Sequence, residues 1–208
     1  MGVRMPEIKG IVFDLGGVIV DSFEFSFYDR VAKDLGMPAK RIQKTVSGNW
    51  ALMEVGGETN LQFWNRMAQD LKLDNPLSGK LLAKLWLDSY VRDAKILKAG
   101  LALAKKLGQR YPLGVISNTQ HEHVAINKKR KLFDNFDALV LSSEVGLRKP
   151  QEGIFQLVSK KLGIPAKHLL FIDDDARWVR VAKEYGFQAI LYRDAPSAEV
   201  QLKKMGIL

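Results

Sequence analysis

Four polar stretches of the sequence contain the side chains that are best suited to chemistry. Each of them comes after a short apolar run. In chain order they are Asp14, Ser117-Asn118, Lys149 and Asp173-Asp174-Asp175. An isolated acid, a hydroxyl, a lysine and an acid cluster together favour chemistry on an anionic group with help from a metal ion.

The acid cluster indicates which metal and which reaction. Three consecutive carboxylates repel one another unless a cation or strong hydrogen-bond donors compensate. Mg²⁺ is a natural compensator near Asp14, because it prefers oxygen ligands and leaves room for water and phosphate. A lysine and a hydroxyl suit the oxygens of a phosphoryl group, and a carboxylate can attack phosphorus to give an aspartyl phosphate. The glycines after Asp14 would let backbone amides approach the phosphate closely.

Each stretch also has a structural explanation that needs no catalysis. Asp14 could cap a strand end, Ser117-Asn118 could cap a following helix, and Lys149 could lie on the surface. Asp173 to Asp175 could simply begin a helix, where acids are favoured. His121, His123 and His168 are predicted to be surface or loop residues, and no metal site is expected among them.

The order of the expected elements explains how distant stretches could meet. Beyond residue 93, helical patterns alternate with short apolar strands, which predicts a parallel sheet with helices on both faces. In such sheets ligands bind at the carboxyl ends of the strands. The expected strands are Ile8–Phe13, Leu113–Ser117, Ala138–Ser142, Leu169–Ile172 and Gln188–Leu191.

Residues 21–92 form a different region, in which the pattern is helical and no convincing strand is found. Thr59 and Gln62 have the spacing of a capping box at the start of one helix, and Pro76 is expected to open another. The fold class is therefore an α/β, Rossmann-like parallel sheet with an inserted helical domain. The core domain is expected at 1–20 and 93–208, and the insertion at 21–92. Trp50, Glu54, Asn60 and Trp64 lie near turns of the insertion, where packing or a surface position explains each of them equally well.

Composition sets the outer limits. The 208 residues fit one domain with a smaller insertion, and the net charge of +9 is interpreted as a solvated basic surface rather than a nucleic-acid site. Cys is absent, so disulfides are excluded, which suits a cytoplasmic protein. No membrane span and no signal peptide are expected.

The ordered set of stretches resembles the haloacid dehalogenase-like (HAD) hydrolases over essentially the full chain. The segment FDLGGVIVDS resembles the family's first motif, usually FDLDGVLVDS, and VISNT resembles the second. The segments GLRKPQEGIF and LLFIDDDARWV resemble the third and fourth motifs. The helical insertion is similar to the family's small cap, which would close over the site and exclude water.

The resemblance implies a role for each matched position. Asp14 would be the nucleophile that accepts the phosphoryl group. Mg²⁺ would be held by Asp14, the backbone carbonyl of Gly16 and Asp174, with Asp173 adjacent. Phosphate positioning and charge neutralisation would come from Ser117, Asn118 and Lys149.

Two positions depart from the usual pattern. Most phosphatases of the family carry a second Asp two residues after the nucleophile, which protonates the leaving oxygen and then activates water. Here that position is Gly16, as it is in a branch with FDLGNV or FDxGGV motifs that includes sugar-phosphate phosphatases. In the fourth motif Arg177-Trp178 stands where relatives often have an acid and then Asn, and this affects the support of the metal.

Three functions agree with these residues. The leading one is an Mg²⁺-dependent phosphatase that hydrolyses a small phosphorylated metabolite, such as a sugar phosphate, through an aspartyl phosphate. A metal-independent haloacid dehalogenase needs only the Asp nucleophile, but such relatives lack paired acids like Asp173-Asp174. A non-catalytic protein that keeps a phosphate or metal site is the third, and Gly16, Arg177 and Trp178 are the reasons to consider it.

Overall fold

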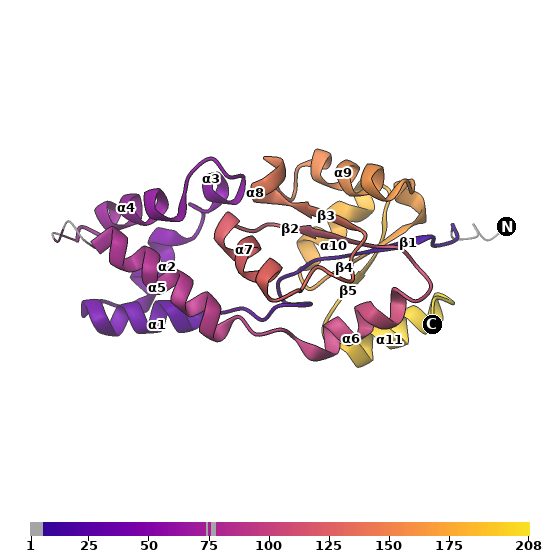
Figure 1. Ribbon diagram of the computed structural model, residues 1–208, viewed down its shortest axis with the longest axis horizontal. Helices are drawn as coiled ribbons and strands as arrows, with labels where there is room; N and C mark the ends of the chain where they lie inside the picture. Colours follow the sequence, from indigo (N-terminus) through magenta and orange to yellow (C-terminus); the bar gives the residue numbers. More distant parts are fainter. Residues whose placement is uncertain (1–5, 74, 76–77) are drawn as a thin grey trace.

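A five-stranded parallel sheet forms the centre of the protein (Figure 1). The structure is a computed structural model that describes residues 6–73, 75 and 78–208. The strand order is β3-β2-β1-β4-β5. The strands are β1 (Gly10–Phe13), β2 (Leu113–Ser117), β3 (Ala138–Leu141), β4 (Leu169–Asp173) and β5 (Gln188–Leu191). The predicted fold class is confirmed, with strand ends shifted by one or two residues.

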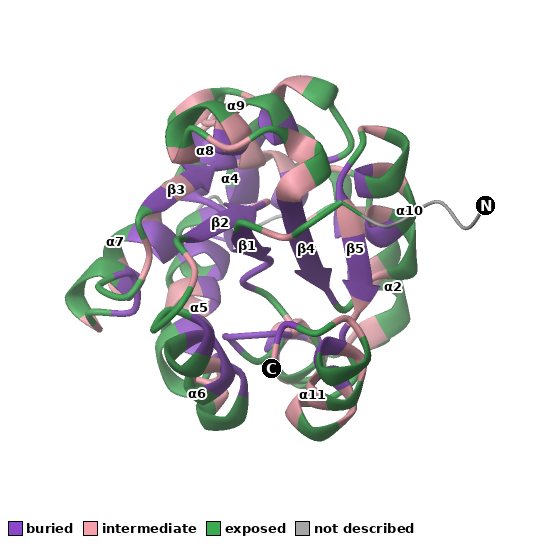
Figure 2. Cartoon of the chain, turned by 90° about the vertical axis from the view of Figure 1, so that its right-hand side faces the viewer, coloured by how far each residue is buried: buried purple, intermediate pink, exposed green. Residues whose placement is uncertain are grey.

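The strands are apolar because both faces of the sheet are covered (Figure 2). Along β1, Ile11 and Phe13 pack on one side and Val12 packs on the other. The helices α6 (Lys98–Leu107) and α11 (Ala195–Lys204) contribute to the first side. On the second side lie α9 (Glu152–Leu162) and α10 (Ala176–Glu184).

The register of the sheet brings the important strand ends together. Phe13 pairs with Val115 on β2 and with Ile172 on β4. The chain continues from β1 into Asp14, whose backbone N–H donates to the Ile172 carbonyl at 2.8 Å. The chain adds β2 and β3 on one side of β1 and β4 and β5 on the other, so the strand order reverses at β1. Ligands of open α/β sheets bind in the crevice at the carboxyl ends of the strands at such a point.

The region after β1 is helical, as expected. Its helices are α1 (Glu24–Leu35), α2 (Ala39–Val46), α3 (Ala51–Glu54), α4 (Asn60–Asp70) and α5 (Ser78–Asp93), and they are called the helical block below. The capping box at the start of α4 is present, with Thr59 accepting from the Gln62 backbone and Gln62 accepting from the Thr59 backbone. The expected helix start at Pro76 lies outside the described residues, and the four-residue α3 was not predicted.

Aromatic side chains form the interior of the helical block. Trp64, Trp86 and Phe27 are almost completely buried, and their rings lie 4.9 to 5.5 Å apart. Trp50 stacks on Phe63 and on Trp86. No helix among the described residues is long and apolar enough to cross a membrane.

The helical block joins the core through two neighbouring segments. Val20 on the incoming segment forms an antiparallel bridge with Ile96 on the outgoing one. Arg130, which follows α7 (His121–Lys129), donates to the carbonyls of Val91 and Ala94 at 2.9 and 2.7 Å. These contacts hold both ends of the block at one place on the core.

Candidate active site

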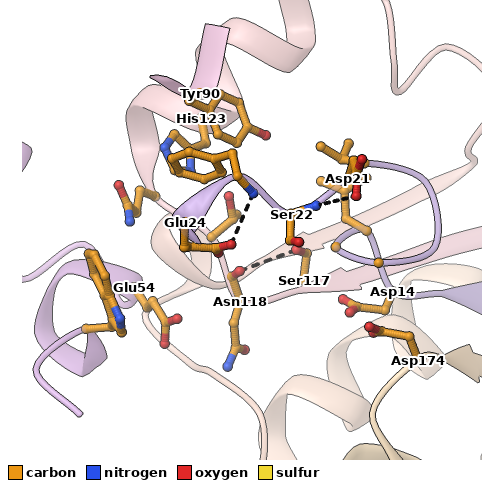
Figure 3. A pocket seen from close by; sticks show the side chains of 18 of the residues that line it. Asp14, Asp21, Ser22, Glu24, Glu54, Tyr90, Ser117, Asn118, His123 and Asp174 are labelled. Carbon is orange, nitrogen blue, oxygen red and sulfur yellow. Dashed lines mark hydrogen bonds between the residues drawn. The ribbon is translucent and has the colours of Figure 1, made fainter. Parts of the chain in front are cut away.

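A cavity of about 400 Å³ lies at the carboxyl ends of β1, β2 and β4 (Figure 3). Asp14, Ser117, Asn118 and Asp174 line it from the core. The region of the helical block contributes Trp50, Glu54, Trp86 and Tyr90 to the wall, and other lining residues come from the segment after β1, from α7 and from α10. Of the four residues noted near turns of the insertion, Trp50 and Glu54 therefore face the site, whereas Asn60 and Trp64 are not among its lining residues.

Lys149 lies behind the cavity, between two carboxylates. Its Nζ is 3.0 Å from Oδ1 of Asp14 and 2.7 Å from Oδ2 of Asp173, and the residue is 1 % exposed. Burial by itself lowers the pKa of this ammonium, but the two carboxylates more than offset that effect and leave the pKa raised. The surface position considered for Lys149 is therefore wrong, because the lysine is the cation of a buried three-residue network.

Asp14 is a buried acid whose charge depends on this lysine. Burial is the largest influence on its carboxyl group and raises the pKa, the Lys149 ammonium lowers it, and Asp173 raises it again, to about 7 in total. A bound divalent cation would favour the ionised form further. Near neutral pH the Asp14 carboxyl is thus balanced between its protonated and ionised forms, and a bound cation would shift it to the ionised form.

Asp173 and Asp174 differ in what they already bind. Both oxygens of Asp173 are engaged, one with Lys149 and the other with the Asp175 backbone N–H at 2.8 Å. The Asp174 side chain has no such donor among the described residues, and burial and then Asp173 raise its pKa. One oxygen from each of Asp14, Asp173 and Asp174 lies within 4.8 Å of the others, which is a donor set that suits a hard divalent cation.

The two glycines after Asp14 have different environments. A Cβ on Gly17, which has φ +67°, would overlap the carboxylate of Asp174. Gly17 is therefore required where the chain passes the acid cluster. A Cβ on Gly16 would have no neighbour within 4 Å. Gly16 thus lies at the cavity with open space where a side chain could stand.

Ser117 and Asn118 end β2 beside Asp14. Ser117 is buried, and its hydroxyl has only a long contact of 3.5 Å to the Asn118 carbonyl. Asn118 exchanges two hydrogen bonds with the Lys149 backbone, donating through Nδ2 at 3.2 Å and accepting through Oδ1 at 2.8 Å. Asn118 therefore positions the lysine loop, and the role of both residues in substrate binding stays a prediction.

Arg177 and Trp178 do not stand among the clustered acids. The Arg177 guanidinium pairs with Asp175, which also caps α10 by accepting from the Arg177 backbone N–H at 2.8 Å. The Trp178 ring is 5.7 Å from Lys149 Nζ. The carboxylate of Asp173 is held by Lys149 and the Asp175 backbone, so it does not depend on an Asn at either position.

His123 is placed differently from the prediction. It is 6 % exposed, its ring stacks on Tyr90 with centroids 3.6 Å apart, and Nε2 has no hydrogen-bond partner. Burial and, to a lesser extent, Arg130 lower its pKa to about 3, so the imidazole is neutral. The sequence around His123 predicted only a polar helix. The Tyr90 ring that stacks on it belongs to α5, more than thirty residues earlier in the chain.

Comparison with known proteins agrees with this geometry. The family model for haloacid dehalogenase-like hydrolases matches residues 8–186. The chain belongs to this family. As a HAD hydrolase it carries all four matched stretches at one edge of its sheet.

The relatives of this HAD hydrolase include enzymes with two chemistries. It is 26% identical to an (S)-2-haloacid dehalogenase of Pseudomonas putida, over 88% of this chain and 83% of that protein. It is also 26% identical to a phosphoglycolate phosphatase of Yersinia pseudotuberculosis, over 90% and 82%. A crystal structure of a HAD family enzyme from Bacteroides thetaiotaomicron, in complex with magnesium and inorganic phosphate, is 25% identical with a TM-score of 0.70, covering 89% of this chain and 94% of that one. The fold therefore does not distinguish dehalogenation from phosphate hydrolysis, and the evidence for one of them must come from the residues of the site.

Proposed function

We propose that this HAD hydrolase is an Mg²⁺-dependent phosphatase that hydrolyses a small phosphorylated metabolite through a phosphorylated Asp14. The observation that carries the proposal is the buried network in which Lys149 bridges Asp14 and Asp173, with Asp174 beside them. The Asp14 carboxylate, with the Lys149 ammonium beside it and Asp174 nearby, suits the transfer of an anionic group. The phosphatase among the relatives supports the same conclusion.

The bond changes follow from the positions of these side chains. A carboxylate oxygen of Asp14 attacks phosphorus, and the bond from phosphorus to the ester oxygen breaks with its electron pair on the leaving alkoxide. The Lys149 ammonium stays beside Asp14 and keeps it ionised as the phosphate approaches. The alkoxide takes a proton from solvent water. A second water then attacks phosphorus and loses a proton to solvent, the acyl phosphate bond breaks, and the Asp14 carboxylate and inorganic phosphate are released.

Asp14 and Asp174 would hold the Mg²⁺, and the Gly16 carbonyl is the further ligand expected from the family resemblance. The bound ion would neutralise charge on the phosphoryl oxygens. Because both oxygens of Asp173 are engaged, its expected role is to position Lys149 and the loop before Asp175. This division of roles would give the two neighbouring acids different mutant phenotypes.

A haloacid dehalogenase is the second candidate, because one of the relatives has that activity and the same type of nucleophile could displace a halide. Its substrate carries a carboxylate, and in the described part of the chain no Lys or Arg lines the cavity. The acid pair at Asp173-Asp174 also has no evident use in a reaction without a metal. Both observations favour the phosphatase.

One experiment separates these functions from each other and from a non-catalytic role. We expect p-nitrophenyl phosphate to be hydrolysed with Mg²⁺, and the rate to fall to background with EDTA. Asp14→Asn, which removes the charge with almost no change in volume, should abolish turnover and keep the circular dichroism spectrum. The matched control is Asp134→Asn, an exposed acid remote from the cavity, which should retain full activity. Halide release from 2-chloropropionate without Mg²⁺, or full activity of Asp14→Asn, would contradict the proposal. A screen of phosphorylated metabolites then ranks substrates.

A further inference from the structure

The wall of the cavity is acidic. Its charged residues are Asp14, Asp21, Glu24, Glu54, Asp174 and Asp175, and no Lys or Arg is found among the lining residues that the structure describes. Figure 3 shows Asp14 and Asp174 at one side of the cavity, Glu54 at the other, and Glu24 between them. The phosphoryl group must lie next to Asp14, so the remaining space toward Glu24 and Glu54 belongs to the leaving group.

The nearby cations already pair with three acids of this wall, Glu54, Asp175 and Asp14, and compensate their charge. Nε of Arg148 lies 2.7 Å from Oε2 of Glu54, and Arg177 pairs with Asp175. Lys149 is shared by Asp14 and Asp173. Within the described chain no Lys or Arg nitrogen lies within 4 Å of the carboxylates of Asp21 or Glu24, which accept only backbone N–H groups. Of these two carboxylates without a basic partner, Glu24 lies toward the leaving-group space, and Asp21 lines the cavity on the side of Asp14.

The wall also contains several aromatic side chains. Phe23, Trp50, Trp86 and Tyr90 line the cavity beside these acids. The buried imidazole of His123 lines it as well, and its Nε2 lacks a hydrogen-bond partner. Since the ring is neutral, it does not offset the acidic charge. Aromatic faces beside carboxylates are the surroundings that bind ammonium groups, through ring quadrupole and Coulomb attraction together.

We propose that the substrate is the phosphate monoester of an amino alcohol, whose ammonium group lies between Glu24 and the aromatic wall while its phosphate lies at Asp14. This inference rests on the proposed phosphatase function and names the substrate class for it. An anionic leaving group, such as the carboxylate of phosphoglycolate, would meet Asp21 and Glu24 without any free cation. A neutral alcohol would be accepted but gains nothing from the charges.

The test uses three phosphate monoesters with leaving groups of two carbons and different charge. They are 2-aminoethyl phosphate, ethyl phosphate and phosphoglycolate. With Mg²⁺ we expect kcat/KM to fall in that order, by about tenfold at each step. A tenfold change is the effect expected when two partly exposed charge contacts are gained or lost. Equal values, or a higher value for phosphoglycolate than for 2-aminoethyl phosphate, would overturn the inference.

Variants locate the effect in the wall. Glu24→Gln should lower the ratio of kcat/KM for 2-aminoethyl phosphate to that for ethyl phosphate, toward one. Asp21→Asn should also lower this ratio toward one, and this variant replaces Glu24→Gln in the test if Glu24→Gln fails to fold. Glu152→Gln, an exposed acid at the start of α9, is the matched control and should keep the wild-type ratio. A ratio unchanged in both wall variants would show that the ammonium lies elsewhere.

The two proposals fail in different ways. Hydrolysis of p-nitrophenyl phosphate with the charge order reversed leaves the phosphatase function standing and rejects only the amino alcohol. If no phosphate ester is hydrolysed, the proposed function fails, and calorimetric binding of 2-aminoethyl phosphate and phosphoglycolate with Mg²⁺ decides the charge question. Tighter binding of 2-aminoethyl phosphate then supports the acidic aromatic wall, and tighter or equal binding of phosphoglycolate rejects it.

Discussion

Gly16→Asp tests whether the site lacks a proton donor for the leaving oxygen. The replacement is sterically open, because a Cβ at this position meets no atom within 4 Å and the backbone is not in the left-handed region. The neighbouring Gly17 is the informative contrast, since a side chain there would strike the Asp174 carboxylate. A new carboxyl at residue 16 would stand at the cavity, two residues after the nucleophile.

The size of the gain follows from two opposing effects. General acid help is worth roughly 10²–10⁴ in rate, or about 3–5 kcal/mol. Asp14 and Asp174 would raise the pKa of the new carboxyl through charge repulsion, which favours its protonated form. Nothing holds the new side chain in place, however, so ordering it costs about 0.5–1 kcal/mol. We therefore expect alkyl phosphates to be hydrolysed about 20-fold to 5,000-fold faster.

The assay is a Brønsted plot of kcat/KM against leaving-group pKa for a series of phosphate esters. The wild-type plot should fall steeply as the leaving-group pKa rises, because an unprotonated alkoxide is a poor leaving group. Gly16→Asp should flatten the plot by accelerating alkyl esters and leaving p-nitrophenyl phosphate nearly unchanged. Gly17→Ala is the matched control, and it should lose activity with every ester because it displaces Asp174.

Two results would refute this reasoning. An equal gain on aryl and alkyl esters would mean that the new carboxyl does not act by protonating the leaving oxygen. A flat wild-type plot, with chemistry shown to be rate-limiting, would mean that another residue already donates the proton. Asp21, which lines the same cavity, would then be the first candidate.

Three further predictions follow from the network and its surroundings. Asp174→Ala should raise the Mg²⁺ concentration for half-maximal activity at least about tenfold. Asp175→Ala should leave it unchanged but lower the free energy of unfolding by about 1 kcal/mol through loss of the α10 cap. Magnesium titrations and urea denaturation of both variants check this, and a reversed order would contradict the assignment. Lys149→Met should lower the free energy of unfolding at pH 7.5 by about 3–5 kcal/mol, since it leaves two buried carboxylates without a cation. The loss should be smaller at pH 5, where the Asp14 carboxyl can protonate, and equal losses at both pH values would argue against the buried network. Burial lowers the pKa of His123 in the folded protein from its usual 6.5 to about 3, so its stabilising effect is complete above pH 6.5 and declines as the pH falls. Between pH 6.5 and 5 this one group should cost the wild type about 2 kcal/mol, and His123→Phe should abolish that part of the decline in urea denaturation. An identical decline in variant and wild type would show that the imidazole is not buried in neutral form.

The parallel sheet and the positions of its strands along the chain could be anticipated from local signals. Each strand is a short apolar run between turn residues, and helices separate the strands, which together predict parallel pairing. The motif residues then had to lie at one edge, because parallel strands end on the same side. The expectation that Asp14, Asp173 and Asp174 lie close together followed from this geometry, and the structure places them within one cluster.

Features that depend on distant packing could not be predicted. Lys149 precedes Pro150 in a polar loop, so only the family resemblance placed its ammonium near Asp14, and its complete burial and its contact with Asp173 were not predicted. The same holds for His123, which is covered by Phe23 and Tyr90 from the helical block. The helix α3 and the four-residue α8 (Ser142–Val145) are too short to show a periodic pattern. The cap role of the helical block, and the domain limits at 21–92, stay predictions.

The bridge between Val20 and Ile96 bears on how the chain reaches its native pairing. Ile11 of β1 must find Leu113 of β2 across about 100 residues of chain. If the helical block folds first and brings Val20 beside Ile96, the loop that remains to be closed shortens to about 25 residues. The entropic cost of closing it then falls by about 1 kcal/mol, because that cost grows with the logarithm of loop length. The insertion that walls the cavity would thus also shorten the search by which the two central strands meet.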